Sequence, residues 1–271
     1  MPKAGPEQFR SIDEYRRAVA AFYGVCGLIL LAFGKHDLDL KNFIIRNLVA
    51  RTATMVRGVM NLWDLNDFQD GWILCRSLLD RLFHLVDIDE NNRYEEFENW
   101  SFYRQHKVYQ VMRSDPQVPD AADGQIPPTA HSKSRYDKLS KAPPKWERAR
   151  AKDVAKSFGF PPLYKYGYDI ASTYVHPMAN DGLQDFFNIT GLEPPRNFPD
   201  HRSLLQNSIV VGCLIVQESL NRCDFQWHSV IKPFFPSLMN HLKDGSDESM
   251  DALLKAAQTM ASETNLCRPK S

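Results

Sequence analysis

Apolar residues recur at helical spacing through most of this chain, and clusters of proline separate one such segment from the next. Alternating β-branched runs are few, and no Asn-Gly or Asp-Gly turn joins two of them, so strands have little support. Because proline cannot occupy a helix interior without breaking it, the clusters mark helix boundaries. We therefore predict an all-α fold, a helical bundle of about seven to nine helices with two long irregular connections.

Capping residues and prolines set the expected helix boundaries. Ser11 and Glu14 form a capping box ahead of the first helix, which should end near Gly34. The two irregular connections are expected at 114–129 and 180–200, where prolines gather. Further helices are expected at about 40–65, 67–89, 93–112, 132–142, 146–158, 161–176, 202–225, 229–242 and 248–262.

The domain organisation follows from the same boundaries. No internal repeat is found, and 271 residues suffice for one large helical domain. We predict a single domain over 1–271, with a partly mobile inserted segment at about 114–160 that begins in the first proline-rich connection.

Composition excludes several classes of protein. Lys and Arg together number 33, as do Asp and Glu, so no global field draws the chain to nucleic acid or membrane. Five cysteines form no CxxC pair and no Cys/His cluster, which is typical of a reducing cytoplasm. The sequence also has no Gly-rich phosphate loop, HExxH or GxSxG motif. We predict no cofactor and no metal site.

The run from Ala18 to Phe33 raises the question of a membrane segment. Its 16 residues would span only ~24 Å as a helix, less than the ~30 Å hydrocarbon layer. It also fails as a signal peptide, because Glu7, Asp13 and Glu14 precede it. We predict a buried core helix, no membrane partner and a cytoplasmic location.

Charge is uneven along the chain. Six acids and one arginine lie between Asp87 and Glu98, whereas nine basic residues and three acids lie in the basic segment, 132–156. One interpretation is two solvated helix faces that attract each other. The other interpretation is a surface for RNA phosphates, with Tyr136 and Trp146 available for stacking. The second interpretation assigns nucleic-acid binding to Lys133, Arg135, Lys138, Lys141, Lys145, Arg148, Arg150 and Lys152.

Two expected helices carry reactive side chains at the edge of an apolar arc. At 100° per residue, Arg76 and Asp80 fall at such a boundary and are spaced to pair, while His84 falls on the polar side. On the second helix Tyr168 belongs largely to the apolar arc, Ser172 marks the boundary, and His176 lies outside it before Pro177.

Two stretches, "RSLLD" (76–80) and "YDIASTYVH" (168–176), carry a family resemblance. Together they resemble a bacterial family of uncharacterised helical proteins with Arg-x-x-x-Glu and Tyr-x-x-x-Ser-x-x-x-His motifs. That group is similar to abortive-infection proteins of the AbiV type and, more distantly, to HEPN helical bundles, many of which are metal-independent RNases. The departure is Asp80, which stands where the family has Glu and is one methylene shorter.

The resemblance implies a metal-independent endoribonuclease in a toxin or phage-defence context. His176 would be the general acid or base, Arg76 would stabilise phosphoryl charge, Asp80 would orient one of them, and Tyr168 and Ser172 would supply hydrogen bonds. Expected partners are RNA through the basic segment, a second copy of the chain, and a protein from a neighbouring gene. The HEPN spacing of Arg and His also occurs in 196–201 and 222–228, but chance supplies roughly 1.6 such pairs in this composition.

A second hypothesis is that the protein is not an enzyme. The same five residues could form a polar network that fixes two helices in register, in a helical module that binds a partner protein or a small ligand.

Overall fold

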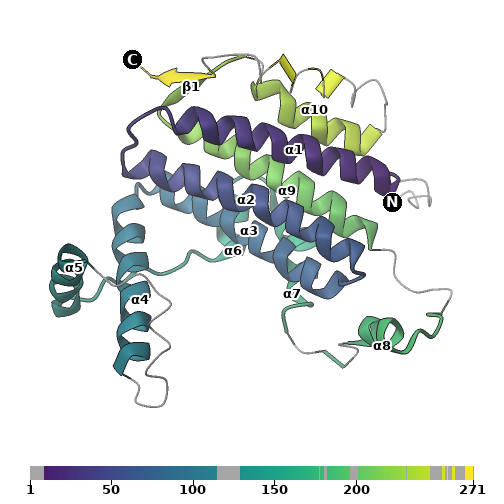
Figure 1. The fold of residues 1–271 in the computed structure, drawn as a ribbon, viewed down its shortest axis with the longest axis horizontal. Helices are drawn as coiled ribbons and strands as arrows, with labels where there is room; N and C mark the ends of the chain where they lie inside the picture. The colour runs from purple at the N-terminus through teal and green to yellow at the C-terminus, as the bar shows by residue number, and fades with distance from the viewer. Residues whose placement is uncertain are drawn as a thin grey trace. The chain divides into compact units, whose positions relative to one another are not determined.

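The computed structural model describes residues 9–114, 129–176, 178–179, 182–195, 201–229, 231–244, 252–253, 255, 258–259 and 266–270. Over these residues the chain is almost entirely helical, which confirms the all-α prediction (Figure 1). The helices are α1 (Ile12–Phe33), α2 (Leu40–Asp64), α3 (Phe68–Glu90), α4 (Tyr94–Ser114), α5 (Ala130–Lys141), α6 (Ala151–Ser157), the π-helix η2 (Leu163–Tyr168), α7 (Asp169–Ser172), α8 (Leu183–Thr190), α9 (Arg202–Arg222) and α10 (Ile231–Asp244).

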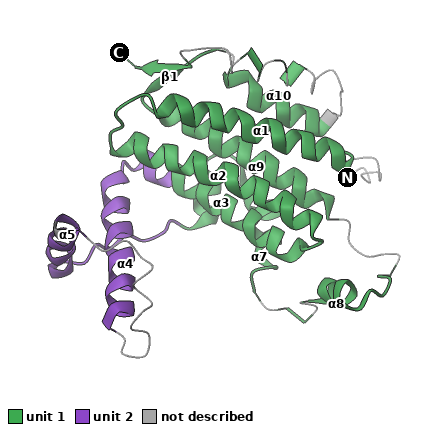
Figure 2. Ribbon diagram, in the orientation of Figure 1, with its two compact units in different colours: residues 1–86, 150–271 green, residues 87–149 purple. Residues whose placement is uncertain are grey.

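The chain divides into two compact units (Figure 2). Unit 1 comprises residues 1–86 and 150–271, and unit 2 comprises residues 87–149. The prediction of one domain over 1–271 with a mobile insert at 114–160 stays a prediction, and residues 115–128 of that insert lie outside the described residues.

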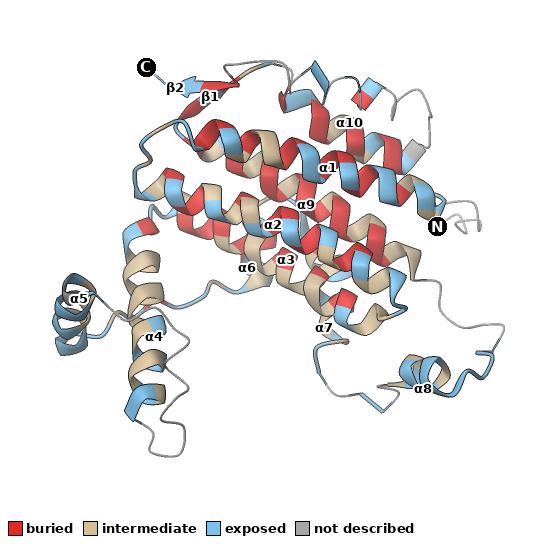
Figure 3. Ribbon diagram, in the orientation of Figure 1, coloured by how far each residue is buried: buried red, intermediate tan, exposed pale blue. Residues whose placement is uncertain are grey.

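The core of unit 1 lies among α1, α2, α9 and α10 (Figure 3). Capping fixes where its first helix begins, because the predicted capping box of Ser11 and Glu14 is present in full. Phe22 of α1 meets Phe235 of α10 edge to face, with ring centroids 6.1 Å apart. All five cysteines are buried as free thiols, as small hydrophobes would be.

A glycine allows α9 to approach its neighbours closely. A Cβ atom at Gly212 would lie 2.7 Å from Val56 Cγ2 of α2 and 3.0 Å from Phe22 Cζ of α1. Real Cβ atoms do not approach other heavy atoms so closely, so the α1–α2–α9 packing requires glycine at this position.

Two helices pass a length-and-composition test for crossing a membrane. They are Ile12–Phe33 and Arg202–Arg222, and the most apolar windows of these helices are 50% and 61% buried within the fold. Core helices of ordinary globular proteins pass the same test, so the finding is weak evidence for a membrane span. The cytoplasmic location stays a prediction.

Two of the observed elements differ from the expected ones. A two-stranded antiparallel sheet pairs β1 (Phe225–Trp227) with β2 (Cys267–Pro269), whereas the helix ending at Arg222 had been expected to reach 225. The expected irregular stretch 180–200 contains α8, and this prediction is wrong because left-handed glycines, Gly182 and Gly191, bracket an eight-residue helix there. Most of the helix expected at 248–262 lies outside the described residues.

In unit 2, an ion pair joins the two helices that carry the charged clusters. Arg135 of α5 donates to both carboxylate oxygens of Glu98 on α4, one of them at 2.9 Å, and also to Asn99 Oδ1 at 2.7 Å. The guanidinium carbon of Arg135 lies 4.2 Å from the Phe102 ring centroid. The Glu98 hydrogen bond raises the pKa of Arg135, which stays charged. The predicted attraction between acidic and basic faces is therefore realised at this pair.

The close approach at Gly212 makes a testable prediction. We expect Gly212→Ala to lower the free energy of unfolding by about 1–3 kcal/mol, because the added methyl overpacks the core. The matched control is Gly24→Ala on α1, where a Cβ would meet nothing within 4 Å. That exposed helical position should gain about 0.5–1 kcal/mol from the higher helix propensity of alanine. Urea unfolding of both variants measures the difference, and equal effects would contradict the packing.

Candidate functional site

Arg76 lies at the centre of a polar cluster that we call the Arg76 network, made up of Arg76, Asp80, Tyr168 and Ser172. Its Nε donates a hydrogen bond to Ser172 Oγ at 2.9 Å. Its Nη1 donates to Asp80 Oδ2, and its Nη2 donates to the Tyr168 hydroxyl oxygen. The structure thus brings together four of the five residues singled out in the sequence, from two segments some ninety positions apart.

Ser172 serves both segments at once. Its hydroxyl donates to the Tyr168 carbonyl oxygen one turn earlier, at 2.6 Å. With its proton used in that way, the oxygen presents lone pairs to Arg76 Nε, so Ser172 accepts while it donates. Both the donor and an acceptor position of the Ser172 hydroxyl are therefore used in hydrogen bonds within the protein.

The segment that contains η2 and α7 lies along α3 in the opposite direction. Gly167 faces Leu79, because a Cβ at this position would lie 3.4 Å from Leu79 Cδ1. The Tyr168 ring lies 5.8 Å from the Phe83 ring, and Tyr174 stacks on Trp72 at 5.3 Å with an interplanar angle of 9°. Contacts therefore move toward the start of α3 as the segment proceeds, and the Arg76 network lies between the two aromatic pairs.

The backbone of this segment departs from the expected regular helix. It begins after Pro162 as a π-helix over Leu163–Tyr168, continues as the short helix α7, and ends at Ser172. A π-helical turn inserts an extra residue, and such turns are frequent at functional sites. Because the helix ends at Ser172, Val175 and Met178 lie beyond it, and they are 43% and 46% exposed.

The network lies at the boundary between core and surface, as the wheel analysis predicted for Arg76 and Asp80. Their side chains are 19% and 21% exposed, and they form the predicted i, i+4 ion pair. The Arg76 guanidinium carbon also lies 3.5 Å from the Tyr168 ring centroid, a close cation–π contact. Arg76 is thus held by packing as well as by hydrogen bonds.

His176 does not belong to the network. It lies in a bend four residues after the end of α7, is exposed, and shows no hydrogen bond among the described residues. The expected helix would have carried it one turn above Ser172. Because the helix ends early, that placement is wrong.

Cys75, the residue before Arg76, is not a candidate nucleophile. It is 1% exposed, and burial raises the pKa of its thiol to about 11. A thiolate would therefore be rare at neutral pH.

The basic residues have differing surroundings. Lys133, Lys138, Lys141, Lys145, Arg148, Arg150 and Lys152 are exposed, whereas Arg135 is held by Glu98. Trp146 is 6% exposed and packs against Phe97 and Trp100, so it is not available to stack on a base. Tyr136 already stacks on Tyr103 at 5.5 Å. Residues up to 149 belong to unit 2, and Arg150 and Lys152 belong to unit 1.

The other described Arg and His residues singled out in the sequence, in 196–201, 222–228 and at position 84, pack against or pair with neighbouring residues. Arg222 forms an ion pair with Glu218 at 3.1 Å, and His228 follows β1. His201 stacks on Phe68 at 4.6 Å, while Arg196 lies outside the described residues. His84, expected on the surface, is half-buried. Among groups of three or more His, Cys, Asp or Glu in the described part of the chain, none is placed to hold a metal ion.

Tyr164 is the residue that sequence reasoning missed. Its ring stacks on Tyr168, with centroids 5.3 Å apart and planes 19° apart. A hydrogen bond with Asp169 raises the pKa of the Tyr164 phenol, since the carboxylate favours the protonated hydroxyl. The available signal was the spacing, because Tyr164 extends the series of Tyr168 and Ser172 by one more step of four, but it had been assigned to the apolar arc.

The Arg76 network makes a stability prediction. We expect Tyr168→Phe to cost about 1–2 kcal/mol in the free energy of unfolding, because the ring packing survives but a hydrogen bond to a charged donor is lost. Arg76→Ala should cost about 3 kcal/mol, since it removes the ion pair to Asp80 together with the hydrogen bonds to Tyr168 and Ser172. The two losses should not add in the double variant, because they share one interaction.

The matched control is Tyr166→Phe, which removes a hydroxyl from a 52% exposed tyrosine two positions earlier. It should shift stability by less than about 0.5 kcal/mol. Chemical denaturation measures all four variants. If Tyr168→Phe lowered the free energy of unfolding no more than Tyr166→Phe, the hydrogen bond between Tyr168 and Arg76 would not contribute to stability.

Comparison with known proteins identifies the family but no close relative. No curated protein matches the chain, and no solved structure matches it. The profile of DUF5677, described as a family of unknown function, matches residues 42–191, which is more than half of the chain and includes the whole Arg76 network. This fits the uncharacterised family expected from the two motifs. The chain belongs to the DUF5677 family.

Proposed function

We propose that this chain is a helical binding module in which the Arg76 network holds the η2–α7 segment against α3 and so presents an adjoining site to a small anionic ligand. One observation carries the proposal. Three of the five N–H groups of Arg76 are bound within the protein, to Asp80, Tyr168 and Ser172. An arginine that stabilises a transition state directs its donors at the reacting group, whereas this one directs them mainly at its own fold.

The module would be a HEPN-like bundle allied to AbiV-type abortive-infection proteins. What supports this proposal is the all-α architecture together with the pairing of the "RSLLD" and "YDIASTYVH" segments. The shorter acid at position 80 still reaches its arginine, because Asp80 pairs with Arg76 across one helical turn.

Metal-independent RNA cleavage, in a toxin or phage-defence context, is the second candidate function. Two observations favour it. Two of the five N–H groups of Arg76 make no hydrogen bond among its described contacts, and the imidazole of His176 is exposed. For cleavage, His176 must come within hydrogen-bond distance of the ribose 2′-hydroxyl, and Arg76 must donate to the phosphate. RNA would then be the partner, with a second copy or a neighbouring gene's protein as regulator.

Variants at Arg76 and His176 separate the two functions. We expect His176→Ala to leave the melting temperature unchanged, since an exposed side chain outside the network contributes little. Arg76→Ala should lower the melting temperature and ligand affinity together. Wild-type protein incubated with labelled single-stranded and structured RNAs, with EDTA and then with Mg²⁺, should release no fragments. RNA cleavage in EDTA that is lost in His176→Ala, while that variant melts like wild type, would overturn the module and establish the nuclease.

A further inference from the structure

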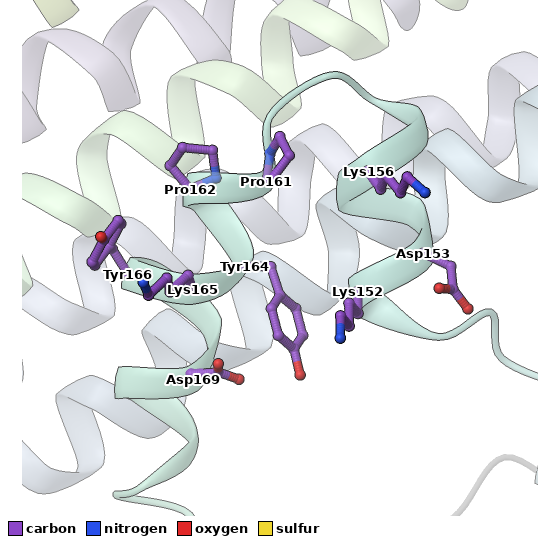
Figure 4. Close-up of a pocket in the computed structure, with 9 residues that line it drawn as sticks. All are labelled: Lys152, Asp153, Lys156, Pro161, Pro162, Tyr164, Lys165, Tyr166 and Asp169. Atoms are coloured by element: carbon purple, nitrogen blue, oxygen red, sulfur yellow. The ribbon is translucent and has the colours of Figure 1, made fainter.

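A pocket of about 810 Å³ lies in unit 1 between α6 and the η2 segment, beside the Arg76 network. Its size is in the range of ordinary small-ligand sites, which run from about 300 to 1,000 Å³. Figure 4 shows Tyr164 projecting from η2 toward α6, with the two prolines closing one end. The lining residues are Lys152, Asp153, Lys156, Pro161, Pro162, Tyr164, Lys165, Tyr166 and Asp169. We call it the Tyr164 pocket.

The aromatic wall of the pocket is held in place from behind. The Tyr164 ring stacks on Tyr168, and Tyr168 in turn lies under the Arg76 guanidinium. The Tyr164 hydroxyl donates a hydrogen bond to the carboxylate of Asp169. Asp169 also lines the pocket, and this hydrogen bond occupies part of its acceptor capacity. A ring fixed at both its face and its hydroxyl is a preorganised surface for stacking a second flat ring.

The opposite wall supplies positive charge. Lys152 and Lys156 are one turn apart on α6, and both are exposed. A third lysine, Lys165, lies on η2 on the same wall as Tyr164, with its ammonium 5.2 Å from the Tyr166 ring centroid. Against these three cations stand Asp153 and Asp169, the second of which accepts from Tyr164. The pocket thus combines a flat aromatic face with ammonium groups across from it.

We infer that the Tyr164 pocket binds a nucleotide, with the base stacked on Tyr164 against the prolines and the phosphate held by Lys152 and Lys156. Base–aromatic stacking contributes about 1–3 kcal/mol per base and tolerates any base, while lysine binds phosphate as a point charge. The nucleotide is either free or one residue of an RNA strand. This inference rests on the proposed binding function and names its ligand class.

The first test is direct titration of the full chain. The probes are AMP, UMP and a fluorescein-labelled single-stranded RNA of about ten nucleotides, within the span of such strand sites. Binding is followed by calorimetry for the nucleotides and by anisotropy for the RNA. Saturable binding of either kind supports the pocket: nucleotide binding indicates recognition of the free unit, and RNA binding alone indicates a strand. Failure of all three probes to bind overturns the inference.

Matched variants place the binding in this pocket. Lys152→Ala with Lys156→Ala should weaken binding at least about tenfold and reduce the salt slope for RNA by about 0.7, because the two lysines hold one phosphate and each phosphate neutralised on a single strand contributes ~0.7. The charge-matched control is Lys232→Ala with Lys243→Ala, two exposed lysines on α10. Tyr164→Leu should weaken binding as well, whereas Tyr164→Phe keeps the ring and should retain it. Equal affinities for the two double-lysine variants would overturn the site.

Failure of this inference is distinguishable from failure of the proposed function. If the chain cleaves RNA in EDTA and both double-lysine variants bind the probe with equal affinity, the binding module and the nucleotide site in the Tyr164 pocket are both overturned. If it binds nucleotide at Lys152 and Lys156 and also cleaves RNA through His176, the pocket stands and only the non-enzymatic module falls. If the chain neither cleaves RNA nor binds any of the three probes, the nucleotide inference is overturned. The proposed binding module then stands with a different anionic ligand.

Discussion

The attachment of one short segment to α3 through the Arg76 guanidinium is the interaction on which the candidate site depends. The segment is a π-helical turn followed by a single α-helical turn, and so short a helix is not stable by its own hydrogen bonds. Its position therefore comes from tertiary contacts: the packing of Gly167 against Leu79, the stacked Tyr174, and the donors of Arg76 to Tyr168 and Ser172. Without the guanidinium, one carboxylate and two hydroxyls at the core boundary would each lose a hydrogen bond to a charged donor.

The same interaction would couple stability to the proposed ligand binding. Arg76 supports Tyr168, Tyr168 supports Tyr164, and Tyr164 forms the aromatic wall of the pocket. A change at Arg76 therefore reaches the pocket through two stacked rings, although Arg76 is not among the residues that line it. Loss of binding in an Arg76 variant is consequently no proof of a direct contact between Arg76 and the ligand.

The contrast between the Arg76 network and His176 bears on how the motif predicted from this sequence is understood. A motif written as Tyr-x-x-x-Ser-x-x-x-His suggests one continuous helical stripe. In this chain the first two members meet Arg76, while the third lies in a bend beyond the helix. The Tyr and Ser of the motif therefore act here as positioning residues for the segment, and any role of His176 depends on what the exposed imidazole meets.

The sequence by itself determined the helices, their main boundaries and the Arg76–Asp80 pair, because capping, proline and i, i+4 spacing act within a few residues of the chain. The capping box of Ser11 with Glu14 and the ion pair of Arg76 with Asp80 are examples that the structure confirms. Tertiary structure alone decided the π-helical turn, the early end at Ser172, the burial of Trp146 and the stacking of Tyr164 on Tyr168. Those features arise from packing against residues far away in the chain, and a local periodicity holds no information on which distant side chain will occupy the facing position.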